Sequence, residues 1–163
     1  MSNLIFLDID DTILSNELYP HCLVNGVFNL DKYRELQETD NSLELYLNSK
    51  ALPLLKWYHK NKDNYQILFL TSRYLFDNDR KQLQHFNIPL AQVISRDLLG
   101  ELGYDYLLNQ PCGIYKSVIL NHFKDLGYNP VMVDDSANVK KYIRAGNFTM
   151  LCANKLNKRL SYA

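Results

Sequence analysis

The chain has 163 residues, of which 47% are hydrophobic and 22% are charged, as is typical of one globular domain. Its 18 basic and 18 acidic side chains give a formal net charge of zero, which argues against a nucleic-acid-binding surface, because such surfaces carry an excess of Lys and Arg. No apolar run approaches the roughly 20 residues of a membrane span, and no basic leader precedes the first run, so we expect a cytoplasmic protein without a membrane partner.

Short apolar runs alternate with helical patterns along the chain. The apolar runs predict five strands, at Leu4–Leu7, Gln66–Leu70, Ala91–Ser95, Pro130–Val133 and Phe148–Cys152. Apolar spacing predicts helices over residues 51–62, 77–86, 115–127 and 136–146, with Asp77 as an N-cap and Gly127 as a C-cap. This order predicts an α/β fold, a mostly parallel sheet of about five strands flanked by helices, in a single domain over residues 1–163.

Two regions interrupt this alternation. Residues 15–50 are a small insertion after the first strand, in which Asn25-Gly26 between apolar pairs predicts a β-hairpin flap. The following segment, 41–48, fits a strand or a short helix equally well. Residues 96–113 contain three glycines and are typical of a loop. Because ligands bind beyond the carboxyl ends of parallel strands, we expect both regions to border the functional site. The basic tail, Asn154–Leu160, is interpreted as a solvated end.

Polar residues follow the strands at the points where the strands end. The acids Asp8, Asp10 and Asp11 follow the first strand, and the polar segment Thr71-Ser72-Arg73 follows the second. Asp134 and Asp135 follow the fourth strand, and Lys116 opens the helix before it. Parallel strands would bring all of these to one edge of the sheet. Five acids at one edge need a cation, and oxygen ligands of this kind suit magnesium.

These residues resemble the four motifs of haloacid dehalogenase-like (HAD) superfamily phosphatases. Asp8-Ile9-Asp10-Asp11-Thr12 is similar to the first motif, and Thr71 to the second. Lys116 is similar to the third motif and Asp134-Asp135 to the fourth. The motifs occur in order across nearly the whole chain. The resemblance implies a Rossmann-like fold and a magnesium-dependent phosphatase with a minimal cap.

The resemblance also implies a role for each residue. Asp8 would be the nucleophile that forms an aspartyl-phosphate, and Asp10 the general acid and then the general base. Thr71 would hydrogen-bond the phosphoryl group, and Lys116 would offset its negative charge. Mg²⁺ would be held by Asp8, the Asp10 carbonyl, Asp134 and Asp135. Ser72 and Arg73 would bind substrate, with a structural ion pair as the equal alternative for Arg73. Asp11 is expected to be a structural acid.

Several functional alternatives remain at this point. The small insertion suggests a nearly uncapped site, open to a phosphoprotein such as one bearing phosphotyrosine, while a small-molecule or nucleotide phosphatase is the alternative. A receiver-like signalling domain uses similar residues, but its Lys follows the last strand, whereas Lys116 precedes the final acidic pair. An inactive binding domain is disfavoured because all four motifs are intact. The four histidines are scattered, and only His21 lies near the predicted flap.

Overall fold

Five parallel strands form the centre of the protein, whose computed structural model describes residues 2–162. Their spatial order is β5 (Val93–Ile94), β4 (Ile67–Leu70), β1 (Ser2–Leu7), β6 (Tyr128–Asp134) and β7 (Thr149–Cys152). All neighbouring pairs are parallel. The chain builds outward from β1 to β5 and then crosses back to β6, so the strand order reverses between β1 and β6. The Rossmann-like α/β fold predicted from the sequence is confirmed.

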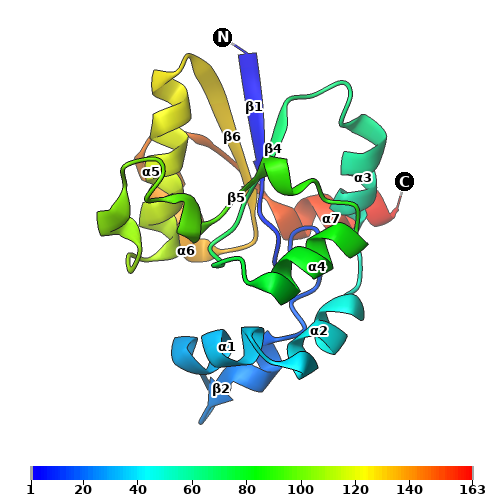
Figure 1. The fold of residues 1–163 in the computed structure, drawn as a ribbon. Coiled ribbons are helices and arrows are strands. Elements are labelled where there is room, and N and C mark those ends of the chain that lie inside the picture. Colours follow the sequence, from blue (N-terminus) through cyan, green and yellow to red (C-terminus); the bar gives the residue numbers. More distant parts are fainter. Residues whose placement is uncertain (1, 163) are drawn as a thin grey trace.

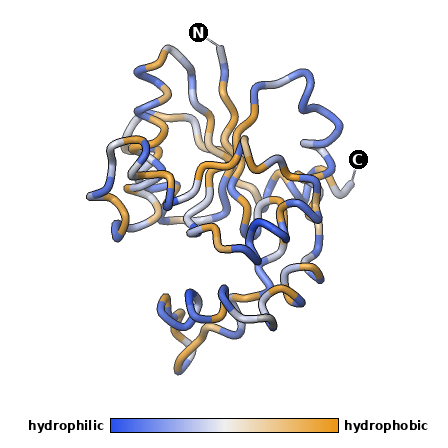
Figure 2. The backbone as a smooth tube through the Cα atoms, viewed as in Figure 1, coloured by the Kyte–Doolittle hydropathy of each residue, from blue (hydrophilic) through white to orange (hydrophobic). Residues whose placement is uncertain are grey.

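Helices cover both faces of this sheet (Figure 1). On β1, Ile5 and Leu7 face one helical layer, while Leu4 and Phe6 face the other, since successive side chains on a strand point to opposite sides. Figure 2 shows the resulting hydrophobic centre between polar outer surfaces. The first layer consists of α3 (Pro53–Asn61), α4 (Asp77–His85) and α7 (Ala153–Ser161), and the second of α5 (Cys112–Asp125) and α6 (Ala137–Ala145).

Residues 19–48 form a small cap next to the carboxyl ends of the strands (Figure 1). The cap comprises a 3₁₀ turn, the predicted hairpin and two short helices: η1 (Tyr19–Cys22), β2 (Leu23–Val24), β3 (Val27–Phe28), α1 (Leu30–Gln37) and α2 (Asp40–Leu47). Asn25 and Gly26 have φ of 51° and 79°, as a tight hairpin turn requires. The segment left open between strand and helix is therefore the helix α2. The cap has its own apolar cluster, Leu18, Cys22, Tyr33 and Tyr46.

The structure differs from two local predictions. Asp77 is the first residue of α4 rather than its N-cap, because the amide of Phe76 donates to Asp79 Oδ2 at 3.0 Å. The basic tail, predicted to be a solvated end, does keep its charged side chains in solvent, but it also forms the helix α7 and packs Leu156 and Leu160 against the core. Because charged residues dominate this segment, its charge pattern gave no indication of the two core-facing leucines. Gly127 follows α5 with φ of 97°, as expected for a residue that ends a helix.

The loop predicted over residues 96–113 contains two 3₁₀ turns, η3 (Arg96–Leu98) and η4 (Asp105–Leu107), and leads into α5. Its residues Leu99 and Leu107 are buried in the α5–α6 layer. Between residues 2 and 162, no helix is both long enough and apolar enough to cross a membrane.

Candidate active site

A tight turn after β1 presents the first acids at the carboxyl edge of the sheet. The Ile9 carbonyl accepts hydrogen bonds from the amides of residues 12, 13 and 14, and Asp11 adopts a left-handed conformation with φ of 58°. Asp11 Oδ1 accepts from the Asn16 amide at 3.0 Å, so Asp11 shapes the turn, as expected of a structural acid. Because the turn folds back on itself, Asp8 faces the sheet edge while Asp10 lies two residues further out.

Lys116 lies between two buried acids that come from the two central strands. Its Nζ donates to Asp8 Oδ1 at 2.9 Å and to Asp134 Oδ2 at 2.7 Å. Lys116 and Asp134 are almost completely buried, and Asp8 is 6% exposed. Thr12 Oγ1 donates to the other oxygen of Asp8 at 3.3 Å. The strand reversal between β1 and β6 thus brings together residues 108 positions apart in the chain.

Three carboxylates near Lys116 lie close enough together to bind one cation. Asp8, Asp134 and Asp135 each offer an oxygen, and these oxygens lie within 4.8 Å of one another. Three carboxylates and one ammonium leave a formal charge of −2 (three negative charges and one positive). That charge and an all-oxygen ligand set fit one divalent cation such as Mg²⁺.

The pKa values of these groups also indicate that the site has too little positive charge to balance its acids. Burial, with the nearby Asp134 carboxylate, raises the pKa of Asp8 well above its usual range, although Lys116 opposes the rise. Burial and Asp134 likewise raise the pKa of Asp135 to about 6. Burial alone would lower the pKa of Lys116, but Asp134 and Asp8 more than offset it and raise that pKa. One ammonium is therefore insufficient for all of the acids, and a bound cation would ionise them fully.

Thr71 and Ser72 follow β4 on the other side of β1. Thr71 is buried, its amide donates to the Ile94 carbonyl, and its hydroxyl oxygen accepts from the Arg73 amide at 3.2 Å. Within residues 2–162 no acceptor takes the hydroxyl hydrogen of Thr71, which leaves it available to a ligand oxygen. The Ser72 carbonyl accepts from Arg96 Nε at 2.9 Å, which fixes the backbone of this segment.

Arg73 does not face an open substrate site. It is 4% exposed, and its guanidinium donates to both oxygens of Asp10, to Asp79 and to Gln82. Of the two sequence-based interpretations, the structure favours the structural ion pair over substrate binding. The chain turns after Thr71, and this turn directs the Arg73 guanidinium between the core and the cap, away from an open site.

Sequence reasoning missed the residues that connect the cap to this site. Gln37 and Tyr46 from the cap both donate to the Asp79 carboxylate, at 3.0 and 2.7 Å. Asn157 of α7 also went unnoticed: its side chain donates to the Thr12 carbonyl and accepts from the Leu54 amide, which ties the first motif to the helical layer. No local pattern marks any of these side chains, since their partners lie 33 to 145 positions away.

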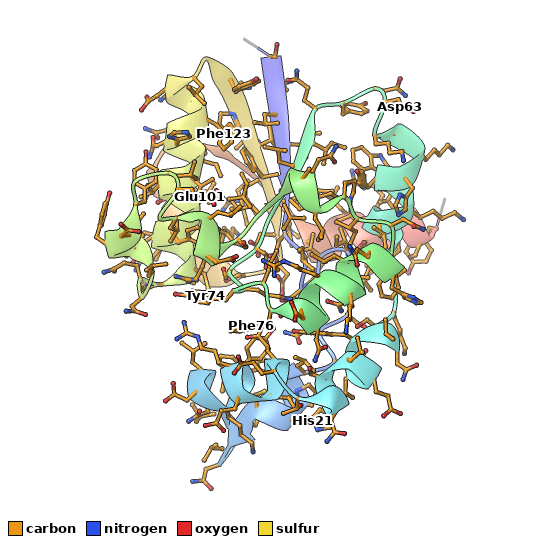
Figure 3. All side chains as sticks on the ribbon, in the orientation of Figure 1. His21, Asp63, Tyr74, Phe76, Glu101 and Phe123 are labelled. Carbon is orange, nitrogen blue, oxygen red and sulfur yellow. The ribbon has the colours of Figure 1, made fainter. Side chains whose placement is uncertain are left out.

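Tyr74 and Phe76 lie between the core and the cap (Figure 3). The Arg34 guanidinium of α1 lies over the ring of Tyr74 at 4.7 Å, which gives the cap a further contact with the core. His21, the histidine nearest the predicted flap, is exposed on the side of the cap that points away from the sheet (Figure 3). It therefore has no place in the acid cluster.

No family model, curated protein or solved structure matches this chain in the three comparisons made. The likeness to HAD phosphatases consequently depends on the motifs and on the arrangement of their residues.

Proposed function

We propose that this protein is a magnesium-dependent phosphatase of the HAD type, which hydrolyses a phosphomonoester through an aspartyl-phosphate on Asp8. The observation that carries the proposal is the placement of Lys116 between Asp8 and Asp134, with Asp135 as a third carboxylate within 4.8 Å. A structural ion pair needs one acid for one lysine. The excess negative charge at a sheet edge instead suits the binding of a divalent cation together with a phosphate ester.

In the first step, an oxygen of Asp8 attacks the phosphorus atom. The new bond joins Asp8 to phosphorus, and the bond from phosphorus to the leaving oxygen breaks. Asp10 gives a proton to that leaving oxygen as general acid. Lys116 and the Thr71 hydroxyl stabilise negative charge on the phosphoryl oxygens and on Asp8.

In the second step, Asp10 takes a proton from water while the water oxygen bonds to phosphorus. The bond between phosphorus and Asp8 breaks, its electron pair returns to the carboxylate, and inorganic phosphate leaves. Asp8, Asp134, Asp135 and the Asp10 carbonyl would hold Mg²⁺, which would supply positive charge at the phosphoryl group when bound.

For the substrate, we propose a phosphorylated protein segment, with phosphotyrosine as the first candidate. The cap spans only residues 19–48, and it carries exposed Tyr19 and Phe28, whose rings stack at 5.4 Å. A small cap leaves room for a large substrate, and its exposed aromatic side chains offer an apolar surface against which a protein segment can pack. A screen of phosphopeptides, nucleotides and sugar phosphates would separate this proposal from a small-molecule or nucleotide phosphatase.

The decisive experiment compares two Asp-to-Asn variants with the unchanged protein on an aryl phosphate in Mg²⁺. Asp8→Asn is expected to abolish hydrolysis, and a chelator is expected to do the same in the unchanged protein. Asp11→Asn is the matched control, because asparagine keeps the oxygen that accepts from Asn16 and tolerates the positive φ. Full activity of Asp8→Asn, or full activity in excess chelator, would refute the proposed function.

A further inference from the structure

The Arg73 guanidinium holds the carboxylate of Asp10 through two hydrogen bonds. Nε donates to Asp10 Oδ2 at 2.8 Å and Nη2 donates to Oδ1 at 2.5 Å. The side chain of Arg73 is 2% exposed and that of Asp10 is 21% exposed. A two-bond fork fixes the plane of a carboxylate as well as its position, which a single contact does not do. Each Asp10 oxygen retains a further acceptor site, and the exposed fraction of the side chain leaves Asp10 accessible to water.

The guanidinium is itself held from the opposite side. Its Nη1 donates to Gln82 Oε1 at 2.6 Å and to Asp79 Oδ1 at 3.2 Å. Asp79 is completely buried, so its carboxylate has no solvent to move into. Arg73 therefore lies between two acids, and a rotation that released Asp10 would break contacts with Asp79 and Gln82 as well.

The cap completes this arrangement. The Tyr46 ring lies 4.8 Å from the guanidinium carbon of Arg73, and the Tyr46 hydroxyl donates to Asp79 Oδ1 at 2.7 Å. Gln37 Nε2 donates to the two Asp79 oxygens at 3.0 and 3.2 Å and to the Tyr74 carbonyl at 3.2 Å. A continuous set of contacts thus runs from the cap helices through Asp79 and Arg73 to Asp10.

We propose that Arg73 is a positioning residue that orients Asp10 for hydrolysis of the aspartyl-phosphate, and that Tyr46 and Gln37 of the cap maintain this orientation through Asp79. The inference rests on the proposed function, since it concerns the step in which Asp10 takes a proton from water. A general base must be held within about 0.5 Å of its productive position, and a misplacement of about 1 Å can cost roughly 100-fold in rate. The cap therefore influences hydrolysis of the aspartyl-phosphate by orienting Asp10, in addition to bordering the entrance of the site.

The test compares the same substitution at two arginines. Arg73→Lys keeps the charge but cannot form the fork to Asp10. Arg80→Lys is the control, because Arg80 on α4 pairs with Asp77 and Asp97 and touches neither Asp10 nor the Thr71-Ser72 segment. Rapid mixing with a nitrophenyl phosphate in saturating Mg²⁺ separates the burst of nitrophenol from the later release of phosphate.

We expect Arg73→Lys to slow phosphate release by about 10- to 100-fold and to leave the nitrophenol burst within about threefold of the unchanged protein, because this leaving group departs without a proton. The aspartyl-phosphate should then accumulate. With an alkyl phosphate, whose leaving oxygen needs a proton, both phases should slow. Arg80→Lys should change neither phase by more than about threefold. An equal loss in both phases with the nitrophenyl ester would overturn the inference.

A double-variant cycle tests whether Arg73 acts through Asp10. In an Asp10→Asn background, Arg73→Lys should cause no further slowing of phosphate release, whereas independent roles would give multiplied losses. Multiplied losses would overturn the inference.

Tyr46→Phe keeps the ring beneath Arg73 and removes only the hydroxyl donor to Asp79. It should slow phosphate release by about 2- to 10-fold, as expected for the loss of one hydrogen bond. If Arg73→Lys does not fold, this variant tests whether the contacts through Asp79 orient Asp10. Unchanged phosphate release in Tyr46→Phe would overturn the role of the cap. Failure of the proposed function itself is seen separately, as an unchanged protein that forms no aspartyl-phosphate on Asp8.

Discussion

Replacing Lys116 with methionine would leave the two acids that it bridges buried without a positive partner. Methionine occupies a similar length, so the change removes the charge and two hydrogen bonds, of 2.9 and 2.7 Å, while it keeps most of the packing. Removal of one partner from a buried ion pair typically costs about 3–5 kcal/mol, because the remaining charge is left desolvated. Here Asp134 is 1% exposed and Asp8 is 6% exposed, so neither acid can turn to water.

That loss is large on the scale of a whole domain, whose free energy of unfolding is about 5–15 kcal/mol. With a urea slope of about 2 kcal/mol per M, a loss of about 4 kcal/mol lowers the midpoint of unfolding by about 2 M. For a chain of this length, a loss of about 3–5 kcal/mol lowers the melting temperature by about 6–20 °C.

The assay is urea unfolding of the metal-free protein, followed by circular dichroism. Lys140→Met, an exposed lysine on α6, is the control and should change the free energy of unfolding by less than about 0.5 kcal/mol. Adding Asp8→Asn to Lys116→Met should restore part of the loss, since it removes one uncompensated charge. A loss below about 1 kcal/mol in Lys116→Met, or no recovery in the double variant, would refute the account of the ion pair.

Three further outcomes are expected. Mg²⁺ at 100 times its dissociation constant should stabilise the protein against urea by about 2.7 kcal/mol, and Asp135→Asn should reduce this gain; no gain in the unchanged protein would count against the cation site. Because the pKa of Asp135 is raised to about 6 from 3.8, the folded state binds this proton more tightly than the unfolded state, so the stability of the metal-free protein should fall as pH rises from about 4 to about 7. Urea titrations at several pH values would check this, and a rise over that range would contradict it. Gly113→Ala should cost about 1–3 kcal/mol in thermal unfolding, since its Cβ would lie 2.4 Å from the Tyr142 ring; Ser117→Ala on the same helix is the control, and equal stability of the two variants would contradict the packing argument.

The sheet and its site edge were predictable because they depend on local signals. Apolar runs marked all five strands, and the acids that follow them could be assigned to one edge once the strands were taken as parallel. Lys116 was assigned from its place in the motif order, and it does lie between Asp8 and Asp134. The catalytic roles remain predictions, because they concern a reaction rather than an arrangement.

The contacts of Arg73 could not be read from the sequence. Its partner Asp10 lies 63 positions away. Tyr46 reaches Asp79 from the segment 41–48, whose fold the pattern left undecided, and Gln37 reaches it from a part of the insertion where no element was predicted. A buried arginine and a substrate-binding arginine look identical in one sequence, since only the surrounding packing separates them. The helix α7 was missed for a related reason, because its charged residues outnumber the two leucines that anchor it.

The pairing of β1 with β6 also has a consequence for the order in which the chain folds. Ser2 pairs with Tyr128, so during synthesis β1 waits for a partner 126 residues behind it, roughly 6–25 s at common translation rates. During that time one edge of β1 can add a strand from another nascent chain. The three acids at its end, Asp8, Asp10 and Asp11, place like charges against any such copy in register. The repulsion that the folded protein must offset would therefore protect the growing chain from aggregation.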